Sequence, residues 1–193
     1  MRVTWRPVRG SAGCWPATCS VICAVWSIFG HTDVAAHQHG HFLDDSQATE
    51  ALGAALAACC PAGSSIHLFG DLGAGKSTLV RGFLHSLGHR GPVKSPTYTL
   101  VEGYELSGQR YFHFDLYRLG DPEELEYLGI RDYFDGQSIC LLEWPQRGKG
   151  FLPTPSLVIE LHYHSHGREA ILRPGRPDAA TILDCIDRHF SSR

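Results

Sequence analysis

The chain has 193 residues, of which 43% are hydrophobic and 19% are charged, a composition typical of a globular protein with one substantial core. Its formal net charge of -3 excludes a broadly basic surface that binds nucleic acid through the whole molecule. Seven cysteines are present without a C-x-x-C pair, so from Cys59 onward we expect small core residues of a reducing compartment.

Residues 1–41 differ in character from the rest of the chain. Three arginines precede the apolar run 21–29, and small residues follow it, an order that imitates a secretory signal peptide. The run is short for a transmembrane helix, which needs about 20 apolar residues. We therefore interpret residues 1–41 as an N-terminal extension, either disordered or read from a mis-assigned start, and residues 42–193 as one domain.

Three histidines alternate near the end of this extension, namely His37, His39 and His41. In an extended segment such residues can ligate a metal ion. No carboxylate or cysteine framework accompanies them in the sequence, so we expect a solvated, histidine-rich linker.

The domain is predicted to begin with a helix that runs to about Cys60. Asp44, Asp45 and Ser46 are candidate N-caps, because short polar side chains accept hydrogen bonds from the first backbone amides of a helix. Apolar residues at 48, 52, 55, 56 and 59 fall on one face, and Pro61 ends the helix.

The segment Gly70–Ser77, GDLGAGKS, fits the pattern G-x-x-x-x-G-K-[ST] at every fixed position, which is the phosphate-binding loop of P-loop NTPases. Its glycines let the backbone approach an anion, so that successive N–H groups can point at phosphates. Lys76 is placed to reach the β- and γ-phosphates, and the Ser77 hydroxyl is a ready Mg²⁺ ligand. An apolar strand at 65–69 precedes the loop and a helix at 76–87 follows it, which is the required order.

The rest of the chain alternates between strand-like and helical patterns. The predicted elements are, in order, a hairpin of 98–106 and 110–117, a short acidic helix from Pro122, a strand at 138–144, a hairpin of 156–164 and 168–173, and a helix at 178–190. These patterns predict the α/β class, with a P-loop NTPase three-layer α/β/α core, a mixed sheet and β-hairpins.

Two carboxylates are candidates for the acid that a P-loop enzyme places near Mg²⁺. Glu143 ends the apolar run 139–142, which predicts a strand buried on both faces, and open α/β sheets bind ligands beyond the carboxyl ends of such strands. Asp115 lies in an alternating segment, so we expect it to project from a half-exposed strand toward a nucleotide. The alternative for each is a solvated carboxylate, or one paired with Arg118 or Arg147.

Four motifs, GDLGAGKST at 70–78, SPTYTL at 95–100, HFDLYR at 113–118 and LEWP at 142–145, occur in the order and spacing of one family. From Phe42 onward the chain resembles the TsaE family, bacterial ATPases needed to make threonylcarbamoyladenosine in tRNA, next to the anticodon. The resemblance implies ATP and Mg²⁺ as cofactors, weak hydrolysis, the TsaD and TsaB proteins as partners, and a cytoplasmic location without a membrane. It leaves direct contact with tRNA open.

The resemblance also implies roles for individual residues. The phosphates would be surrounded by Asp71, Leu72, Gly73, Ala74, Gly75, Lys76 and Ser77, with Thr78 near the α-phosphate. Ser77 and Glu143 would hold Mg²⁺, and the expected catalytic residues are Lys76, Asp115 and Glu143. A switch-like loop would contain Ser95, Pro96, Thr97 and Thr99. Trp144 would flank the site. Thr49 and Arg168 would lie in segments that enclose the adenine.

Other functions are compatible with a P-loop. A small-molecule kinase usually needs an arginine-rich lid, which we do not see in the sequence, and a guanine-specific switch needs an [NT]-K-x-D tetrapeptide, which does not follow the P-loop. In a third alternative the nucleotide is a structural clamp in a protein-binding module. No residue is an evident arginine finger, so we expect slow hydrolysis by the chain alone and activation by partners.

Overall fold

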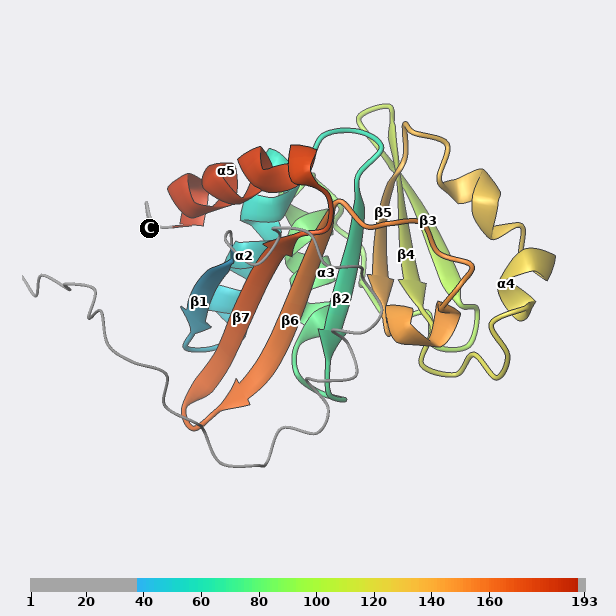
Figure 1. Cartoon of the computed structure of the whole chain (residues 1–193). Coiled ribbons are helices and arrows are strands. Elements are labelled where there is room, and N and C mark those ends of the chain that lie inside the picture. Colours follow the sequence, from blue (N-terminus) through green and yellow to red (C-terminus); the bar gives the residue numbers. More distant parts are fainter. Residues whose placement is uncertain (1–37, 191–193) are drawn as a thin grey trace, which may run out of the picture. The chain divides into compact units, whose positions relative to one another are not determined.

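A seven-stranded mixed sheet organises residues 38–190, the part of the chain that the computed structural model describes (Figure 1). The strands are β1 (His39–Leu43), β2 (Ser65–Gly70), β3 (Val101–Leu106), β4 (Gln109–Asp115), β5 (Ile139–Glu143), β6 (Leu157–His164) and β7 (Gly167–Pro174). Their order is β1-β7-β6-β2-β5-β4-β3. The central strands run parallel to one another, namely β6, β2, β5 and β4. At one side of the sheet β3 pairs antiparallel with β4, and at the other side β7 pairs antiparallel with β6 and β1 with β7. This arrangement confirms the predicted α/β class with a mixed sheet.

Helices cover both faces of this sheet. The helices are α2 (Ser46–Cys59), α3 (Lys76–Ser86), α4 (Glu124–Tyr127) and α5 (Ala180–Phe190), with 3₁₀ turns η2 (Ile130–Tyr133), η3 (Pro145–Gly148) and η4 (Pro177–Ala179). Helices α2, α3 and α5 share one core, whereas α4 and η2 pack on the other face, beside β4 and β5 (Figure 1). Both α4 and α5 begin two residues later than predicted. None of the helices described between 38 and 190 combines the length and apolarity needed to cross a membrane.

Strand β5 shows how the sequence pattern produces the layers. All of its residues are buried. Ile139 and Leu141 belong to the core that α2, α3 and α5 cover, whereas Cys140 and Leu142 belong to the core that contains Leu125 of α4. Because successive side chains of a strand point to opposite faces, a continuous apolar run requires cover on both sides. The predicted doubly buried strand is confirmed.

Helix α2 packs closely on the helix that follows the P-loop. Asp45 is its N-cap, since its Oδ1 accepts a hydrogen bond from the Ala48 amide at 2.8 Å. A Cβ atom on Gly53 of α2 would lie 2.1 Å from the Leu79 carbonyl oxygen of α3. Only glycine therefore permits this approach of the two helices, which places the start of α2 beside the P-loop.

Strand β1 was not predicted from the sequence. It pairs antiparallel with β7, with His41 opposite Ala170, so the interpretation of His39 and His41 as part of a solvated linker was wrong. Asp187 of α5 contacts both histidines. The sequence near the histidines offers no such carboxylate, and the one that contacts them comes from the far end of the chain. The predicted domain boundary at 42 falls inside β1, while His37 and the signal-like segment lie outside the described residues.

The first predicted hairpin is shorter than its sequence pattern. Its first strand begins at Val101 instead of Tyr98, because the Leu100 amide donates to the Pro96 carbonyl oxygen at 2.7 Å and Leu100 takes a φ of 63°. Strand β4 lies between β3 and β5 and ends at Asp115. Asp115 is consequently buried, and the expectation of a half-exposed strand was wrong at this position.

Two cysteines are joined in a disulfide, so the expectation of small, free core residues from Cys59 onward was wrong for Cys59 and Cys185. Cys59 at the end of α2 is bonded to Cys185 of α5, with their Cα atoms 5.7 Å apart. Cys60 and Cys140 are free and buried, as expected. The bonded residues are 126 positions apart, and only the packing of α5 on α2 brings them together.

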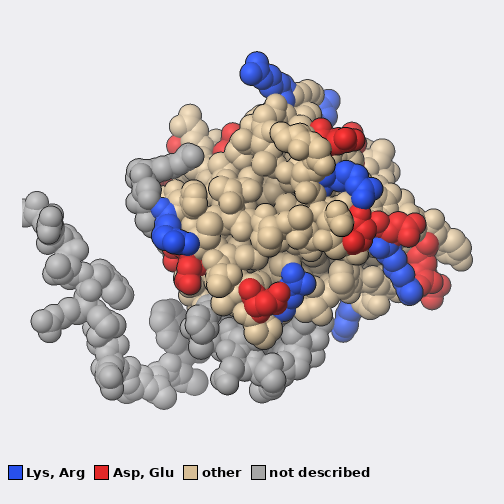
Figure 2. Space-filling view, turned by 90° about the horizontal axis from the view of Figure 1, so that it is seen from above, with Lys and Arg blue, Asp and Glu red and all other residues tan. Residues whose placement is uncertain are grey.

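Charged side chains of both signs are interspersed on the face shown in Figure 2. This view is from above Figure 1, so it looks onto the end of the sheet opposite the arrowheads of β2, β4 and β5. The described residues of this face form no continuous basic area. The arrangement agrees with the net charge of -3 and gives a nucleic-acid backbone no basic surface on this side.

Buried His67 of β2 leads to a prediction about pH. The residue is 4% exposed, its Nε2 has no hydrogen-bond partner among the described residues, and burial lowers its pKa from 6.5 to about 4. The folded chain therefore keeps a neutral imidazole where the unfolded chain is protonated. This contribution to stability is complete above the unfolded pKa of 6.5 and is lost as the pH falls toward about 4, by about 2–3 kcal/mol.

We expect His67→Met to reduce this dependence. The difference in free energy of unfolding between about pH 7 and about pH 4.5, measured with urea, should shrink by about 2 kcal/mol. His166→Gln replaces an exposed histidine and should leave the wild-type dependence unchanged. An equal loss of stability on acidification in wild type and His67→Met would contradict the assignment of this pH dependence to His67.

Candidate functional site

A cavity of about 380 Å³ lies at the carboxyl ends of β2, β4 and β5. Its walls come from the P-loop and the start of α3, from the loop before β3, and from the residues that end β4 and β5. The predicted site residues in its lining are Leu72, Gly73, Gly75, Lys76, Ser77, Thr78, Asp115 and Glu143. Two other predicted residues of the loop do not line it. Ala74 is fully buried, and Asp71 contributes its carbonyl oxygen to Lys76.

The path of the P-loop depends on glycine. Gly70, Gly73 and Gly75 have φ values of 138°, 79° and 110°, a region that disfavours other residues. A Cβ on Gly70 would also lie 2.4 Å from the Leu161 carbonyl oxygen of β6. Because α3 begins directly after Gly75, its first free N–H groups and its positive dipole end open at the cavity. The cavity wall is thus suited to an anion.

Lys76 supplies a buried positive charge to this wall. Its Nζ donates to the carbonyl oxygens of Gly70 and Asp71, each at 2.8 Å, and lies 4.2 Å from the centroid of the Trp144 ring. Burial lowers the pKa of the ammonium from its usual value, and the carboxylates of Glu143, Asp115 and Asp71 oppose this shift. These contacts fix the ammonium between the loop and the two strand-end acids.

Asp115 and Glu143 lie side by side in the sheet. They are directly paired in the parallel register of β4 and β5, and both side chains are buried at the cavity. Oδ2 of Asp115 accepts hydrogen bonds from the hydroxyls of Ser95 and of Thr97, the latter at 2.8 Å. Its Oδ1 accepts from the Tyr117 amide at 3.0 Å. Three donors therefore hold this carboxylate in one orientation.

His113 is a site residue that the sequence analysis missed. Its Nε2 lies 2.8 Å from Oε1 of Glu143, and both side chains are buried. Since a carboxylate only accepts hydrogen bonds, Nε2 carries the proton, and Nδ1 has no partner among the described residues. His113 and Asp115 are two residues apart in the alternating segment and therefore share a face of β4, but the strand that pairs with β4 was needed to reveal the contact of His113 with Glu143.

Arg118 brings a second cation to the cavity, although the sequence showed no evident arginine finger. Its guanidinium carbon lies 4.4 Å from the centroid of the Tyr98 ring. Tyr98 is 84% exposed, so the aromatic ring that contacts Arg118 at the cavity wall is itself on the surface. The HFDLYR motif contained Arg118, and its proximity to the loop before β3 was the missing information.

Trp144 flanks the cavity, as expected from its position after Glu143. It adopts a left-handed φ of 59°, which follows the end of β5 and begins η3. Its ring lies beside the ammonium of Lys76 and 5.0 Å from the ring of Tyr117. The backbone turn at the end of β5 therefore positions both the acid and this aromatic wall.

Thr49 and Arg168 lie near the P-loop but do not line the cavity. A Cβ on Gly75 would be 3.5 Å from Cγ2 of Thr49, whose hydroxyl donates within its own helix. The guanidinium carbon of Arg168 lies 4.3 Å from the centroid of the Tyr163 ring, and the Tyr163 hydroxyl donates to the Leu72 carbonyl oxygen at 2.7 Å. Both residues thus border the outer side of the loop, and their contact with an adenine stays a prediction.

The comparisons with known proteins agree with this geometry. The family described as threonylcarbamoyl adenosine biosynthesis protein TsaE matches residues 43–171, which is more than half of the chain. The chain belongs to the TsaE family. The resemblance seen in the four motifs is therefore confirmed.

Curated relatives carry the name tRNA threonylcarbamoyladenosine biosynthesis protein TsaE. The Haemophilus influenzae relative is 57% identical over 103 residues, 53% of this chain and 65% of that protein. The Bacillus subtilis relative is 40% identical over 111 residues (58% and 69%), and a Nostoc relative is 38% identical over 150 residues (75% and 90%). The chain thus spans just under two thirds of the length of the first of these TsaE proteins.

A crystal structure of YdiB from Bacillus subtilis has a similar fold. It superposes with a TM-score of 0.68 at 29% identity and covers 79% of this chain and 95% of its own. The TsaE chain described here therefore has the expected P-loop NTPase-like α/β architecture.

Proposed function

We propose that this TsaE family member binds ATP with Mg²⁺ at the cavity, hydrolyses ATP slowly, and acts with the TsaD and TsaB proteins to form threonylcarbamoyladenosine in tRNA. The observation that carries the ATPase proposal is the pair of buried carboxylates, Asp115 and Glu143, lining one cavity with Lys76 of the P-loop. The family description and the names of the relatives support the tRNA pathway. Because the reaction needs ATP, we place the protein in the cytoplasm.

The side chains and backbone at the cavity fit a nucleoside triphosphate. The N-terminus of α3, the ammonium of Lys76 and the guanidinium of Arg118 offer positive potential to phosphate oxygens. The Ser77 hydroxyl and the Glu143 carboxylate line the same cavity, and oxygen ligands of these kinds suit Mg²⁺, which binds through one or two carboxylates and substrate phosphates. When bound, Mg²⁺ neutralises charge on the β- and γ-phosphate oxygens.

In the proposed reaction a water molecule attacks the γ-phosphorus in line with the bond to the leaving oxygen of ADP. Asp115 accepts a hydrogen bond from this water, and the hydroxyls of Ser95 and Thr97 keep its carboxylate aimed. Lys76 and Arg118 stabilise the negative charge that spreads over the phosphate oxygens in the transition state. The chain thereby supplies orientation and charge and forms no covalent intermediate.

The proposed dependence on partners agrees with the rim of the cavity. Leu72 and Tyr98 are large apolar residues that are 68% and 84% exposed, and Tyr98 supports Arg118. A protein surface that covers Tyr98 would fix the position of this arginine. Since a well-placed arginine can accelerate phosphoryl transfer by large factors, such a contact would account for the slow hydrolysis alone and the faster hydrolysis in a complex that we propose.

The contact between His113 and Glu143 leads to a prediction about Mg²⁺. His113→Ala removes the donor that orients Glu143, so the Mg²⁺ concentration for half-maximal hydrolysis should rise by about 10–100-fold. His113→Gln keeps an N–H donor and should recover part of this loss. Mg²⁺ titrations of ATP hydrolysis measure the effect, and equal curves for wild type and His113→Ala would contradict the assigned role.

Co-purification with TsaD and TsaB, with ATP hydrolysis measured alone and in the complex, tests the proposed function. We expect association and a marked stimulation of hydrolysis. No association and no stimulation would overturn the partner assignment while leaving the nucleotide site intact. Transfer of the γ-phosphate to a small molecule in place of water would favour a kinase instead.

A further inference from the structure

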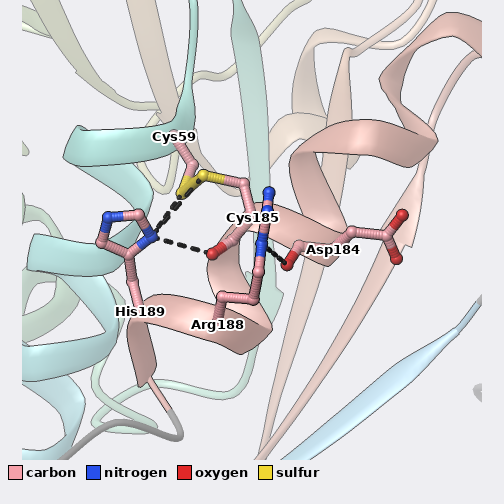
Figure 3. Close-up of a disulfide and its surroundings, with 5 residues drawn as sticks. All are labelled: Cys59, Asp184, Cys185, Arg188 and His189. Carbon is pink, nitrogen blue, oxygen red and sulfur yellow. Dashed lines mark hydrogen bonds between the residues drawn. A yellow bond between two sulfur atoms is a disulfide. The ribbon is translucent and has the colours of Figure 1, made fainter.

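The disulfide between α2 and α5 has a histidine beside it (Figure 3). Nδ1 of His189 lies 3.6 Å from Sγ of Cys59 and 3.7 Å from Sγ of Cys185. The two cysteines are half-buried and the histidine is exposed, so the group is open to small solutes. None of the three residues lines the cavity that holds Lys76, and the group is separate from the proposed ATPase function.

These distances match one face of a tetrahedral zinc site. With Zn–S bonds of about 2.3 Å and a Zn–N bond of about 2.0–2.1 Å, each sulfur lies about 3.6 Å from the nitrogen. The same geometry places the two sulfurs about 3.8 Å apart, near their van der Waals separation. Both N···S distances are therefore already those of a zinc site. Breaking the S–S bond would let the two sulfurs separate to the distance that a zinc site requires.

We propose that the reduced protein binds Zn²⁺ through Cys59, Cys185 and His189. A dithiol reductant first gives two electrons and two protons to the disulfide, so that the reductant becomes a disulfide and the two cysteines become thiols. Binding of Zn²⁺ then releases the two thiol protons and forms two thiolate–zinc bonds, while neutral His189 binds through the lone pair of Nδ1.

The local structure favours this ligand set. Cys185 and His189 are four residues apart on α5, which puts both side chains on one face of the helix. Nδ1 also lies 3.0 Å from the carbonyl oxygen of Cys185, so zinc binding requires the tautomer with the proton on Nε2 and the loss of that contact. Two thiolates and an imidazole are the ligands that zinc prefers in proteins.

The fourth position of the ion is left to water. Figure 3 shows the Asp184 side chain directed away from the sulfurs, and Asp187 contacts His39 and His41 instead. The disulfide and the zinc thiolates would each connect α2 to α5. In a reducing cytoplasm, where cellular thiols reduce the disulfide, the zinc–thiolate bonds would therefore connect α2 to α5 in its place.

Cobalt titration tests this proposal, because Co²⁺ replaces Zn²⁺ and its thiolate complexes absorb visible light. Cys14, Cys19 and Cys23 lie outside the described residues and are replaced by serine in the full chain, so that their thiols do not bind Co²⁺. The protein is first oxidised and then reduced under anaerobic conditions. We expect one equivalent of Co²⁺ to give thiolate-to-cobalt charge-transfer bands only after reduction. Zn²⁺ should displace it and remove the bands.

Single variants assign the ligands. Cys185→Ser should abolish the bands, and His189→Ala, at an exposed position, should weaken Co²⁺ binding by at least about tenfold. Cys60→Ser is the matched control, because Cys60 is next to a ligand but is buried and free, and it should bind as wild type does. Identical binding by reduced wild type and by Cys185→Ser or His189→Ala, or no bands in reduced wild type, would overturn the proposal.

Alkylation of the reduced protein by iodoacetamide, mapped by mass spectrometry, gives a second readout that does not depend on the variants folding. Zn²⁺ should protect Cys59 and Cys185 at least about tenfold relative to the metal-free protein. Equal alkylation of both residues with and without Zn²⁺ would also overturn the proposal.

Discussion

Lys76→Ala should weaken binding of Mg²⁺–ATP by about 100-fold and reduce hydrolysis below detection. Lys76 as a residue is only 4% exposed and lines the cavity together with the two carboxylates, so its loss removes a charge-assisted contact to phosphate of about 2–3 kcal/mol. Isothermal titration calorimetry with Mg²⁺–ATP measures the change in affinity.

Lys149→Ala is the matched control, because this lysine is exposed and does not line the cavity. It should bind ATP as wild type does. The ammonium of Lys76 also bonds two carbonyl oxygens of the loop, so the melting temperature of Lys76→Ala must be compared with that of wild type. Wild-type affinity in a folded Lys76→Ala protein would show that phosphates bind elsewhere.

Asp115→Asn should slow ATP hydrolysis by about 100-fold or more while the affinity for ATP changes by less than about threefold. Asparagine keeps the size of the side chain and an oxygen that accepts from Ser95 and Thr97. It loses the negative charge that orients the attacking water in the proposed reaction. Single-turnover hydrolysis and ATP titration, measured on the same preparation, separate the two effects.

Asp132→Asn changes an exposed acid outside the cavity and should hydrolyse ATP at the wild-type rate. If Asp115→Asn lost affinity and rate in parallel, Asp115 would act in binding and not in the chemical step. A wild-type rate in Asp115→Asn would remove it from the mechanism altogether.

The parts of the site that sequence predicted are those that local patterns determine. The P-loop needs glycines at 70, 73 and 75 because of its own backbone path, and these are visible in a motif. Glu143 was predicted because an apolar run shows a strand buried on both faces and therefore shows where that strand ends. In both cases the information lies within about ten residues of chain.

The parts that sequence missed depend on which distant segments meet. The register of β4 and β5 joins His113 to Glu143, and the sequence of neither strand contains that register. Strand β1 forms only because β7 offers an edge to it, and Arg118 reaches the cavity beside Tyr98 of a preceding loop. Cys59 and Cys185 likewise meet through helix packing. Long-range pairing decides each of these contacts.

The proposed function is that ATP turnover at the P-loop of this chain supports formation of threonylcarbamoyladenosine in tRNA. Its most direct test replaces the TsaE protein of a bacterium by this chain and measures the threonylcarbamoyladenosine content of tRNA by mass spectrometry. We predict that wild type restores the modified nucleoside and that Lys76→Ala and Asp115→Asn do not, although all three accumulate equally. Full restoration by Lys76→Ala would contradict the claim and favour a nucleotide-independent binding module, and no restoration by wild type would contradict the pathway.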